Sequence, residues 1–491
     1  MKEIESLISK IQDYNSGADF ELIKRAFEFA EIAHVGQKRL SKEPVIIHPL
    51  AVANILADYK MDSVSIAAGF LHDTIEDAGI SMVELEKEFG KEVAHLVEGV
   101  TKVSQIRLRG SSEEEYVENL RKMILAMAKD LRVVLVKLAD RLHNMQTLEF
   151  LSPEKQFKNA KETLEVYAPL AERLGMGDMK GRLEDLAFPY VYPQDCAWLI
   201  EYSKPHFKKA EEFLEKATRV IYKKLAKEGI RAKISTRPKH LYSLWRKLLR
   251  SEIDKDIAKI HDLVAMRILV DTVKDCYGAL GVVHSLWKPV PAEGISDFIA
   301  QPKPNGYRSL HTKVFSLKER ILEVQIRTFE MNEEAENGVA AHWYYTGLKS
   351  SGVSDSKLEK GTFAPGEKLH WVEQLVAWQK EVVDSQEFMD ALKFDALAHR
   401  IFVFSPNGDA YDLPQGATPV DFAYAVHSDL GDETNGAIVN GKMVSLDYKL
   451  KSGDMVNIIR KEGAGPSEKW LRFVVTRQAR HQILKHARSK V

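Results

Sequence analysis

Histidines and carboxylates cluster in the first third of the sequence. Residues 72–77 read His-Asp-Thr-Ile-Glu-Asp, which puts one imidazole and three carboxylates within about two helical turns. Side chains four residues apart share a face of a helix, so a continuous helix would place His72 over Glu76 and Asp73 over Asp77. Carboxylates this close repel one another unless a cation lies among them. The segment therefore predicts a metal site.

Two further segments can complete the ligand set. His48 is expected on a different helix or in the loop leading into it, and Asp140 shares a helical face with Asn144 and Thr147. Mixed imidazole and carboxylate ligands suit Mn²⁺ or a similar divalent ion, which lowers the pKa of a bound water and so creates a nucleophile. Any one of these residues alone is more often a core histidine or a surface acid. We interpret three other histidines in that way: His34, His95 and His143.

A second, basic cluster lies in the middle of the chain. Residues 219–250 contain 11 Lys or Arg and one acid, a local net charge of +10. Most of these cations are expected on a solvated helix face. Arg237 and Lys239, however, lie at a strand-to-helix turn, where phosphates also meet backbone N–H groups. Lys247 follows on the next helix, and a triphosphate needs several converging cations.

Residues further along can complete a nucleotide site. Tyr307 offers a flat face for stacking a base, and Asn305 and His311 offer directional hydrogen bonds. Asp262 comes directly before an apolar run, a position that suits a Mg²⁺ ligand at a sheet edge. Glu323 lies on a later strand, where its carboxylate could take a proton from a sugar hydroxyl. Either acid alone is explained equally well as a salt bridge on the sheet surface.

The motifs around both clusters are similar to those of a known family. The spacing of the first cluster resembles HD-type metal phosphohydrolases. The wider sequence resembles the RelA/SpoT-type alarmone hydrolase/synthetases in four motifs, namely Gly-Gln-Lys-Arg at 36–39, Lys-Leu-Ala-Asp-Arg-Leu-His-Asn-Met at 137–145, Arg-Pro-Lys-His at 237–240 and Pro-Lys-Pro-Asn-Gly-Tyr at 302–307.

For the first cluster, the resemblance implies hydrolysis of the 3′-pyrophosphate of (p)ppGpp to GDP or GTP and pyrophosphate. The implied Mn²⁺ ligands are His48, His72, Asp73 and Asp140. The acids that help to activate and orient the water are Glu76 and Asp77, and the nucleotide contacts are Arg39, Asn144 and Thr147. Synthesis-only members of the family lose this set, which is intact here.

For the second cluster, the resemblance implies pyrophosphoryl transfer from ATP to the 3′-hydroxyl of GDP or GTP, giving (p)ppGpp and AMP. The implied contacts to the ATP phosphates are Arg237, Lys239 and Lys247. Tyr307 would stack on guanine, and the acceptor would be surrounded by Lys303, Asn305 and His311. Asp262 would bind Mg²⁺ and Glu323 would be the base. One stretch departs from the family pattern. Family members carry Arg-x-Lys-Asp or Glu-x-Asp-Asp there, and this chain has Gly-Ile-Ser-Asp at 294–297.

The periodicity of apolar residues predicts a multidomain chain, and 491 residues suggest about three domains. The expected segments are an all-α HD-type phosphohydrolase domain at 1–195, an α+β nucleotidyltransferase-like synthetase domain at 196–345, a linker and connecting helix at 346–396, a small β-grasp-like TGS domain at 397–461 and a basic helical tail at 462–491. The TGS domain is expected to contain a hairpin that turns at Asn407-Gly408.

Composition excludes several classes of protein. The 70 basic and 71 acidic residues leave a net charge of -1, which excludes a uniformly basic nucleic-acid coat. Two cysteines cannot form a disulfide framework. The N-terminus lacks an apolar signal core and no apolar run reaches the roughly 20 residues of a membrane span. We therefore expect a soluble, cytoplasmic protein.

The likeness to TGS domains implies a macromolecular partner as well. In long family members this domain contacts uncharged tRNA on a stalled ribosome, and His427 matches a residue used there. A packing or regulatory role for a small β-domain is an equally good interpretation. Two alternatives to a bifunctional enzyme stay open: a (p)ppGpp hydrolase with a vestigial synthetase, and a tRNA- or ribosome-binding stress sensor.

Overall fold

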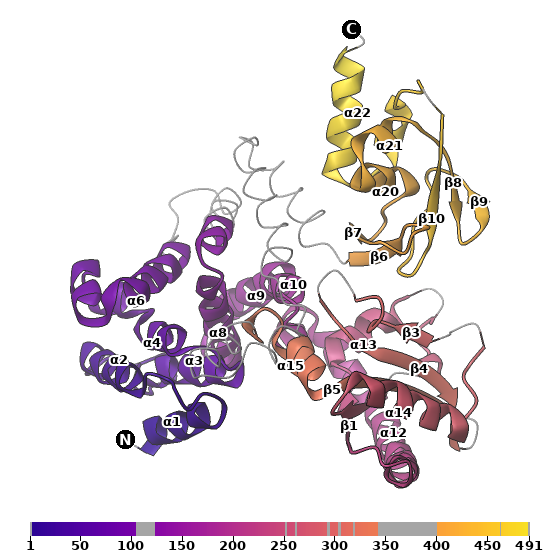
Figure 1. Ribbon diagram of the computed structural model, residues 1–491. Helices are drawn as coiled ribbons and strands as arrows, with labels where there is room; N and C mark the ends of the chain where they lie inside the picture. Colours follow the sequence, from indigo (N-terminus) through magenta and orange to yellow (C-terminus); the bar gives the residue numbers. More distant parts are fainter. Residues whose placement is uncertain are drawn as a thin grey trace. The chain divides into compact units, whose positions relative to one another are not determined.

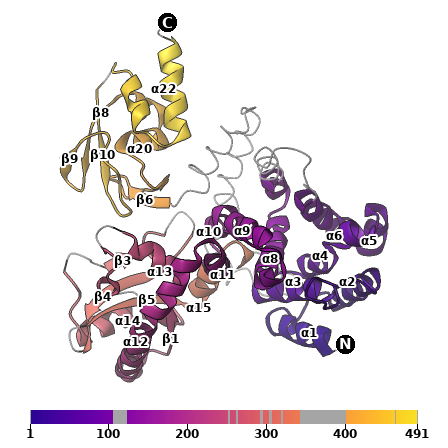
Figure 2. The ribbon, with the colours of Figure 1, turned by 180° about the vertical axis from the view of Figure 1, so that it is seen from behind.

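The structure is a computed structural model that describes residues 2–104, 123–250, 253–260, 263–291, 295–302, 306–317, 320–341, 400–461 and 463–489. These residues form two compact units. The first contains the N-terminal helices and a five-stranded sheet, and the second contains two small sheets and the C-terminal helix (Figures 1 and 2). No helix in these ranges is both long enough and apolar enough to cross a bilayer.

The N-terminal part is all helical, as predicted. Its elements are α1 (Lys2–Tyr14), α2 (Phe20–Ala33), α3 (Ile47–Asp58), α4 (Ser63–Leu71), α5 (Thr74–Ala78), α6 (Met82–Ser104), α8 (Arg132–Gln146), η1 (Leu148–Phe150), α9 (Pro153–Glu162), the π-helical turn η2 (Thr163–Tyr167), α10 (Ala168–Arg173) and α11 (Gly177–Val191). Asp19 and Asp62 cap α2 and α4 through their side chains. Helices α3, α4 and α8 pack against one another, which brings together residues distant in the sequence.

A 35-residue helix, α12 (Pro193–Lys227), leads from the helical part to the sheet. The domain boundary expected at residue 195 therefore lies in the first turn of this helix. Pro193 at the first turn is compatible with a helix start because the first N–H groups of a helix have no intrahelical acceptor.

The five-stranded sheet has the order β1-β2-β5-β4-β3. Its strands are β1 (Ala232–Pro238), β2 (Val264–Val270), β3 (Ile295–Asp297), β4 (Leu310–Phe315) and β5 (Ile321–Thr328). The pair β2/β5 is parallel and the other pairs are antiparallel. The helices of this part are α13 (Leu241–Leu248), the 3₁₀ turn η3 (Ile257–Lys259), α14 (Val273–Leu286) and α15 (Phe329–Asn337).

The two faces of this sheet differ because side chains alternate along each strand. One face is apolar and packs on α12 and α14, with Met266, Val324 and Ile326 at its centre. The other face is polar: the register sets Arg267 beside Gln325 and His311 beside the same Gln325, with Glu323 two residues earlier. The polar face is therefore the one available for chemistry.

The second unit contains the predicted hairpin, formed by β6 and β7. Its elements are β6 (Arg400–Phe404), β7 (Ala410–Pro414), α20 (Pro419–Val426), α21 (Ser428–Asp432), β8 (Thr434–Val439), β9 (Lys442–Val444), β10 (Val456–Arg460), η6 (Glu468–Arg472) and α22 (Arg477–Ser489). Helix α22 packs on α20 through an apolar cluster that includes Tyr424 and Ile483. The linker and connecting helix expected at 346–396 lie outside the described residues.

Candidate active sites

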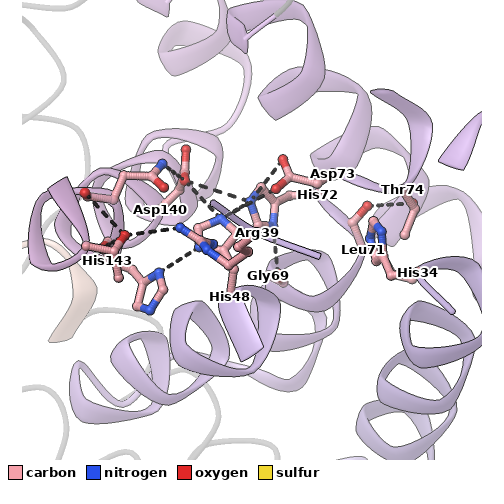
Figure 3. Close-up of polar contacts among 12 residues, drawn as sticks. His34, Arg39, His48, Gly69, Leu71, His72, Asp73, Thr74, Asp140 and His143 are labelled. Atoms are coloured by element: carbon pink, nitrogen blue, oxygen red, sulfur yellow. Dashed lines mark hydrogen bonds and ion pairs between the residues drawn. The ribbon is translucent and has the colours of Figure 1, made fainter. Parts of the chain in front are cut away.

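Four of the predicted ligands come together in the helical part. His48 lies in the first turn of α3, His72 and Asp73 lie between α4 and α5, and Asp140 lies on α8 (Figure 3). Nε2 of His48 is 3.2 Å from Nε2 of His72. The same nitrogen is 3.2 Å from Oδ1 of Asp140 and 3.4 Å from Oδ2 of Asp73. Ligand atoms of His48, His72 and Asp140 all lie within 4.8 Å of one another, and all three residues are buried.

The prediction of one helix across 72–77 is wrong. Helix α4 ends at Leu71 and α5 begins at Thr74, so His72 and Asp73 form the turn between them. Nδ1 of His72 donates to the carbonyl of Gly69 at 2.8 Å, and the Thr74 hydroxyl donates to the carbonyl of Leu71 at 2.6 Å. These bonds to α4 carbonyls hold the turn and let both His72 and Asp73 reach the same point.

The residues present fit a divalent metal ion. Since Nδ1 of His72 carries the proton that Gly69 accepts, Nε2 of a neutral His72 presents its lone pair to the cluster. Burial lowers the pKa of His72, but the Asp73 and Asp140 carboxylates outweigh it and raise that pKa to about 9. The cluster thus attracts positive charge, as a cation site must.

The acids one turn further on differ in their surroundings. The Glu76 side chain is largely exposed, but partial loss of water around its carboxylate, together with the charge of Asp73, raises its pKa. Asp77 is also exposed and lines the cavity beside the metal ligands. The backbone N–H of Asp77 donates to the carbonyl of Asp73 at 2.9 Å, so this pair keeps the one-turn relation that the sequence predicted.

A cavity of about 670 Å³ opens over the cluster. Its lining includes predicted nucleotide contacts on α8 and on the loop before α3: Arg39, Asn144 and Thr147. Nη2 of Arg39 donates to the hydroxyl of Thr147 at 3.1 Å, and Nδ2 of Asn144 donates to Oδ1 of Asp140 at 2.5 Å. Lys137 also lines the cavity, and its i, i+3 spacing from Asp140 was a signal for this role that sequence reasoning did not use.

His143 is a second neighbour of this site that sequence reasoning missed. Its Nδ1 lies 2.7 Å from Nδ1 of His48, and both rings are buried. Burial, followed by the charges of His48 and Arg39, lowers the pKa of His143 to about 4. Of the other two histidines interpreted as structural, His34 is buried with Nδ1 2.8 Å from Gln37 Oε1, and His95 is exposed on α6.

A second set of side chains lies on the polar face of the sheet. Glu323 accepts from Nε2 of Gln325 at 3.2 Å, and its Oε1 is 3.9 Å from Nδ1 of His311. The hydroxyl of Tyr307 and Nε2 of His311 are 2.8 Å apart, and the Phe298 ring meets both residues edge-on. The sheet therefore brings the predicted base, stacking residue and acceptor contact into one neighbourhood.

Three arginines on adjacent strands meet one carboxylate. Oε1 of Glu336 lies 3.3 Å from Arg237, 3.0 Å from Arg267 and 3.0 Å from Arg327. Sequence reasoning selected only Arg237. Arg267 and Arg327 share its face of the sheet. Arg267 interrupts an otherwise apolar strand, and Arg327 continues the polar alternation of Glu323 and Gln325, which was the available signal.

The other two predicted phosphate contacts lie in the turn after β1 and on α13. Lys239 follows β1 in the turn before α13, and its backbone N–H donates to the carbonyl of Leu263 at 3.0 Å. Lys247 lies near the end of α13 and is half-buried. Three predicted residues lie outside the described part of the chain: Asp262, Lys303 and Asn305.

Comparison with known proteins identifies three regions in the order predicted. An HD domain matches residues 26–177, a region found in RelA / SpoT proteins matches residues 236–350, and a TGS domain matches residues 401–460. The chain belongs to the RelA/SpoT family. The cluster of His48, His72, Asp73 and Asp140 lies within the residues that match the HD domain. The polar face of the sheet lies almost wholly within those that match the RelA / SpoT region.

Similar proteins from the family carry names for both reactions. The chain is 48% identical to the GTP pyrophosphokinase of Myxococcus xanthus, over 96% of this chain and 61% of that protein. It is 45% identical to the bifunctional (p)ppGpp synthase/hydrolase RelA of Mycobacterium tuberculosis, over 98% of this chain and 64% of that protein. It is 44% identical to the guanosine-3′,5′-bis(diphosphate) 3′-pyrophosphohydrolase of Aquifex aeolicus, over 98% of this chain and 66% of that protein. The chain thus spans less than two thirds of each relative's length.

The stretch that departs from the RelA/SpoT signature is described in part. Gly294 lies outside the described residues, and Ser296 lies on β3. Oδ1 of Asp297 accepts from the backbone N–H groups of the next turn, 3.0 Å from Ile299 and 2.8 Å from Ala300. Its Oδ2 accepts from the hydroxyl of Tyr277 at 2.9 Å. The acid shared by both family variants therefore shapes this turn.

The TGS match places one more predicted residue. His427 ends α20, and its side chain is 67% exposed. Its Nδ1 accepts from the backbone N–H of Asp429 at 3.2 Å. A tRNA contact through His427 stays a prediction.

Proposed function

We propose that this chain is a bifunctional enzyme that makes and removes (p)ppGpp. One observation carries the proposal: a single chain combines a buried histidine and carboxylate cluster with a separate, arginine-rich sheet face. The similar proteins are named for each reaction and for both. Running both reactions at once would only consume ATP, so we expect the two sites to be active reciprocally.

Hydrolysis is assigned to an HD domain at residues 1–195. His48, His72, Asp73 and Asp140 would hold the divalent ion, for which we propose Mn²⁺ because the ligands are mixed nitrogen and oxygen donors. Such an ion, when bound, lowers the pKa of a coordinated water. Asp77, which lines the cavity, and Glu76, which lies on the same short helix, would accept a proton from that water.

The same cavity supplies binding groups for an anionic nucleotide. The guanidinium of Arg39 is fixed by its bond to Thr147, so it would meet a phosphate with little further loss of side-chain entropy. Asn144 holds Asp140 and lines the cavity, where it can also contact the nucleotide. These groups orient (p)ppGpp so that its 3′-pyrophosphate lies over the ligand cluster.

Synthesis is assigned to residues 196–345. Arg237, Lys239 and Lys247 would bind the phosphates of ATP, and Tyr307 would stack on the guanine of the acceptor. Asp262 would hold Mg²⁺, and such an ion, when bound, would neutralise charge on the transferred group. Lys303 and Asn305 would complete the acceptor site. Glu323 would take the proton of the 3′-hydroxyl. Nε2 of Gln325 donates to its carboxylate, and Nδ1 of His311 lies 3.9 Å from it.

Two incubations of the purified chain test this assignment. Incubation with ATP, GTP or GDP, and Mg²⁺ should give AMP and (p)ppGpp, which nucleotide chromatography would detect. (p)ppGpp with Mn²⁺ should give GDP or GTP and pyrophosphate. Hydrolysis without AMP formation would favour a hydrolase with a vestigial synthetase. The absence of both reactions would favour a tRNA- or ribosome-binding sensor through residues 397–461.

A further inference from the structure

We propose that His143 is a positioning residue that fixes the tautomer of His48 and so sets the divalent-ion affinity of the HD site. The proposal deepens the hydrolytic function given above and rests on its metal site. Its basis is the contact of Nδ1 of His48 with Nδ1 of His143 at 2.7 Å, within a buried cluster (Figure 3).

The tautomer of His48 decides whether it can be a ligand. A neutral imidazole has one N–H and one bare nitrogen, and only the bare nitrogen binds a metal. Nε2 of His48 faces Asp73, Asp140 and His72, so the ligating form must carry its proton on Nδ1. That proton needs an acceptor, and His143 presents Nδ1 at hydrogen-bond distance.

The opposite arrangement excludes the ion. When His143 donates instead, the His48 proton moves to Nε2, where the Asp140 and Asp73 carboxylates lie 3.2 and 3.4 Å away. The proton then occupies the place of the cation. The metal affinity therefore depends on how well position 143 accepts a hydrogen bond, since this selects between the two forms.

The two histidine ligands differ in this respect. The partner of His72 is the carbonyl of Gly69, which can only accept, so His72 is held in its ligating tautomer. The partner of His48 is an imidazole that can accept or donate. His143 also lies on α8 three residues after Asp140, so the helix that provides a ligand also provides the acceptor for another ligand.

The experiment measures Mn²⁺ affinity of the full, metal-stripped chain by isothermal titration calorimetry. His143→Phe keeps a ring but removes the acceptor, and we expect an affinity loss of roughly 10- to 100-fold with the stoichiometry unchanged. His143→Asn keeps an acceptor oxygen near the position of Nδ1, so it should regain most of that loss. Because His143→Phe could disturb packing, His143→Ala provides a second variant without an acceptor and without added bulk.

A matched control separates this role from general packing. His34 is another buried histidine of the same helical part, bonded to Gln37 rather than to the cluster. His34→Phe should leave the Mn²⁺ affinity unchanged. Circular dichroism melts in EDTA, together with AMP formation from ATP and GTP, verify that each variant is folded.

The outcomes are distinct. Wild-type affinity in folded His143→Phe or His143→Ala would overturn the proposal, as would an equal loss in His143→Asn. If the Mn²⁺ affinities of wild type and the variants follow the expected order, but the wild type does not hydrolyse (p)ppGpp, the positioning role stands and the proposed function is contradicted. A wild-type chain that binds no Mn²⁺ would contradict both.

Discussion

Nζ of Lys137 lies 2.7 Å from Oδ2 of Asp140 within one stretch of α8, and their side chains are only 13% and 6% exposed. Burial disfavours both charges, but the carboxylate raises the pKa of Lys137 and the ammonium helps to hold the pKa of Asp140 well below its usual range. Since Lys137 binds Oδ2, Asp140 presents Oδ1 to His48. The ion pair with Lys137 thus leaves Oδ1 of Asp140 as the oxygen that faces His48.

Lys137→Met should therefore destabilise the ion-free protein. Removing one partner of a buried pair leaves the other charge uncompensated, which costs about 3–5 kcal/mol. A bound divalent ion supplies part of the missing positive charge, so saturating Mn²⁺ should reduce the loss. Urea denaturation in EDTA and in Mn²⁺ measures both quantities. The control is Lys161→Met, whose exposed pair with Glu165 should contribute at most about 0.5 kcal/mol. Equal losses with and without Mn²⁺ would show that the pair and the ion are not coupled.

The two reactions should be separable by single substitutions. Asp73→Ala removes a proposed ligand and should stop hydrolysis while synthesis continues, because the sheet site shares no residue with the helical cluster. Glu323→Gln keeps the shape but removes the base, and should lower synthesis by roughly 10²- to 10⁴-fold. Rates of AMP and pyrophosphate formation measure the two effects. If either variant lost both reactions while remaining folded, the two-site assignment would be wrong.

The altered stretch before the nucleotide loop should not abolish synthesis. Gly294 and Ser296 replace two family charges, but the direct contacts expected to stabilise the transition state are elsewhere. Gly294→Arg with Ser296→Lys should change the Mg²⁺ dependence or the GDP/GTP preference by no more than about 1–2 kcal/mol. Initial rates of AMP formation across a Mg²⁺ titration, with each acceptor, measure this. A wild-type chain without synthesis that the double substitution rescues would favour the hydrolase with a vestigial synthetase.

Asp421 should hold the C-terminal helix to the TGS domain. Its buried carboxylate accepts from the N–H and hydroxyl of Thr418 and from the N–H and hydroxyl of Thr476, all at 2.8 Å. Asp421→Ala leaves these donors without their charged acceptor and should cost at least about 1–3 kcal/mol in this unit. Hydrogen exchange should then show lost protection in α22. Asp447→Ala, at an exposed acid of the same unit, should leave that protection unchanged.

Glu184 should make stability depend on pH. Burial raises its pKa despite Lys180 nearby and a 3.3 Å bond from Ser243, so its charged form is disfavoured in the folded state. Below the pKa of the unfolded state, near 4.5, Glu184 is protonated in both states and does not change the free energy of unfolding. As the pH rises from there through the higher pKa of the folded state, the free energy of unfolding falls. Glu184→Gln should therefore melt higher than wild type at pH 7, with a difference that shrinks toward pH 4.5. Exposed Glu201→Gln should show no such trend.

The sequence by itself determined the features that depend on local spacing. The types and order of His48, His72, Asp73 and Asp140, the alternation of β5 around Glu323 and the β6–β7 hairpin all follow from residue identity and periodicity. These features need only the geometry of one helix, one strand or one turn, which neighbouring residues set. The family motifs added roles that spacing alone left open.

Tertiary structure decided what depends on how elements pack. Three features depend on such packing: the break in the helix after Leu71, the contact of His48 with His143, and the ion pairs of Arg267 and Arg327 with Glu336. The spacing of these residues in the sequence does not predict that they meet. An isolated His143 on an apolar helix is indistinguishable from a core histidine until the crossing of α3 and α8 is known. Helix crossings and strand register arise from the simultaneous burial of many side chains, so no local pattern specifies them.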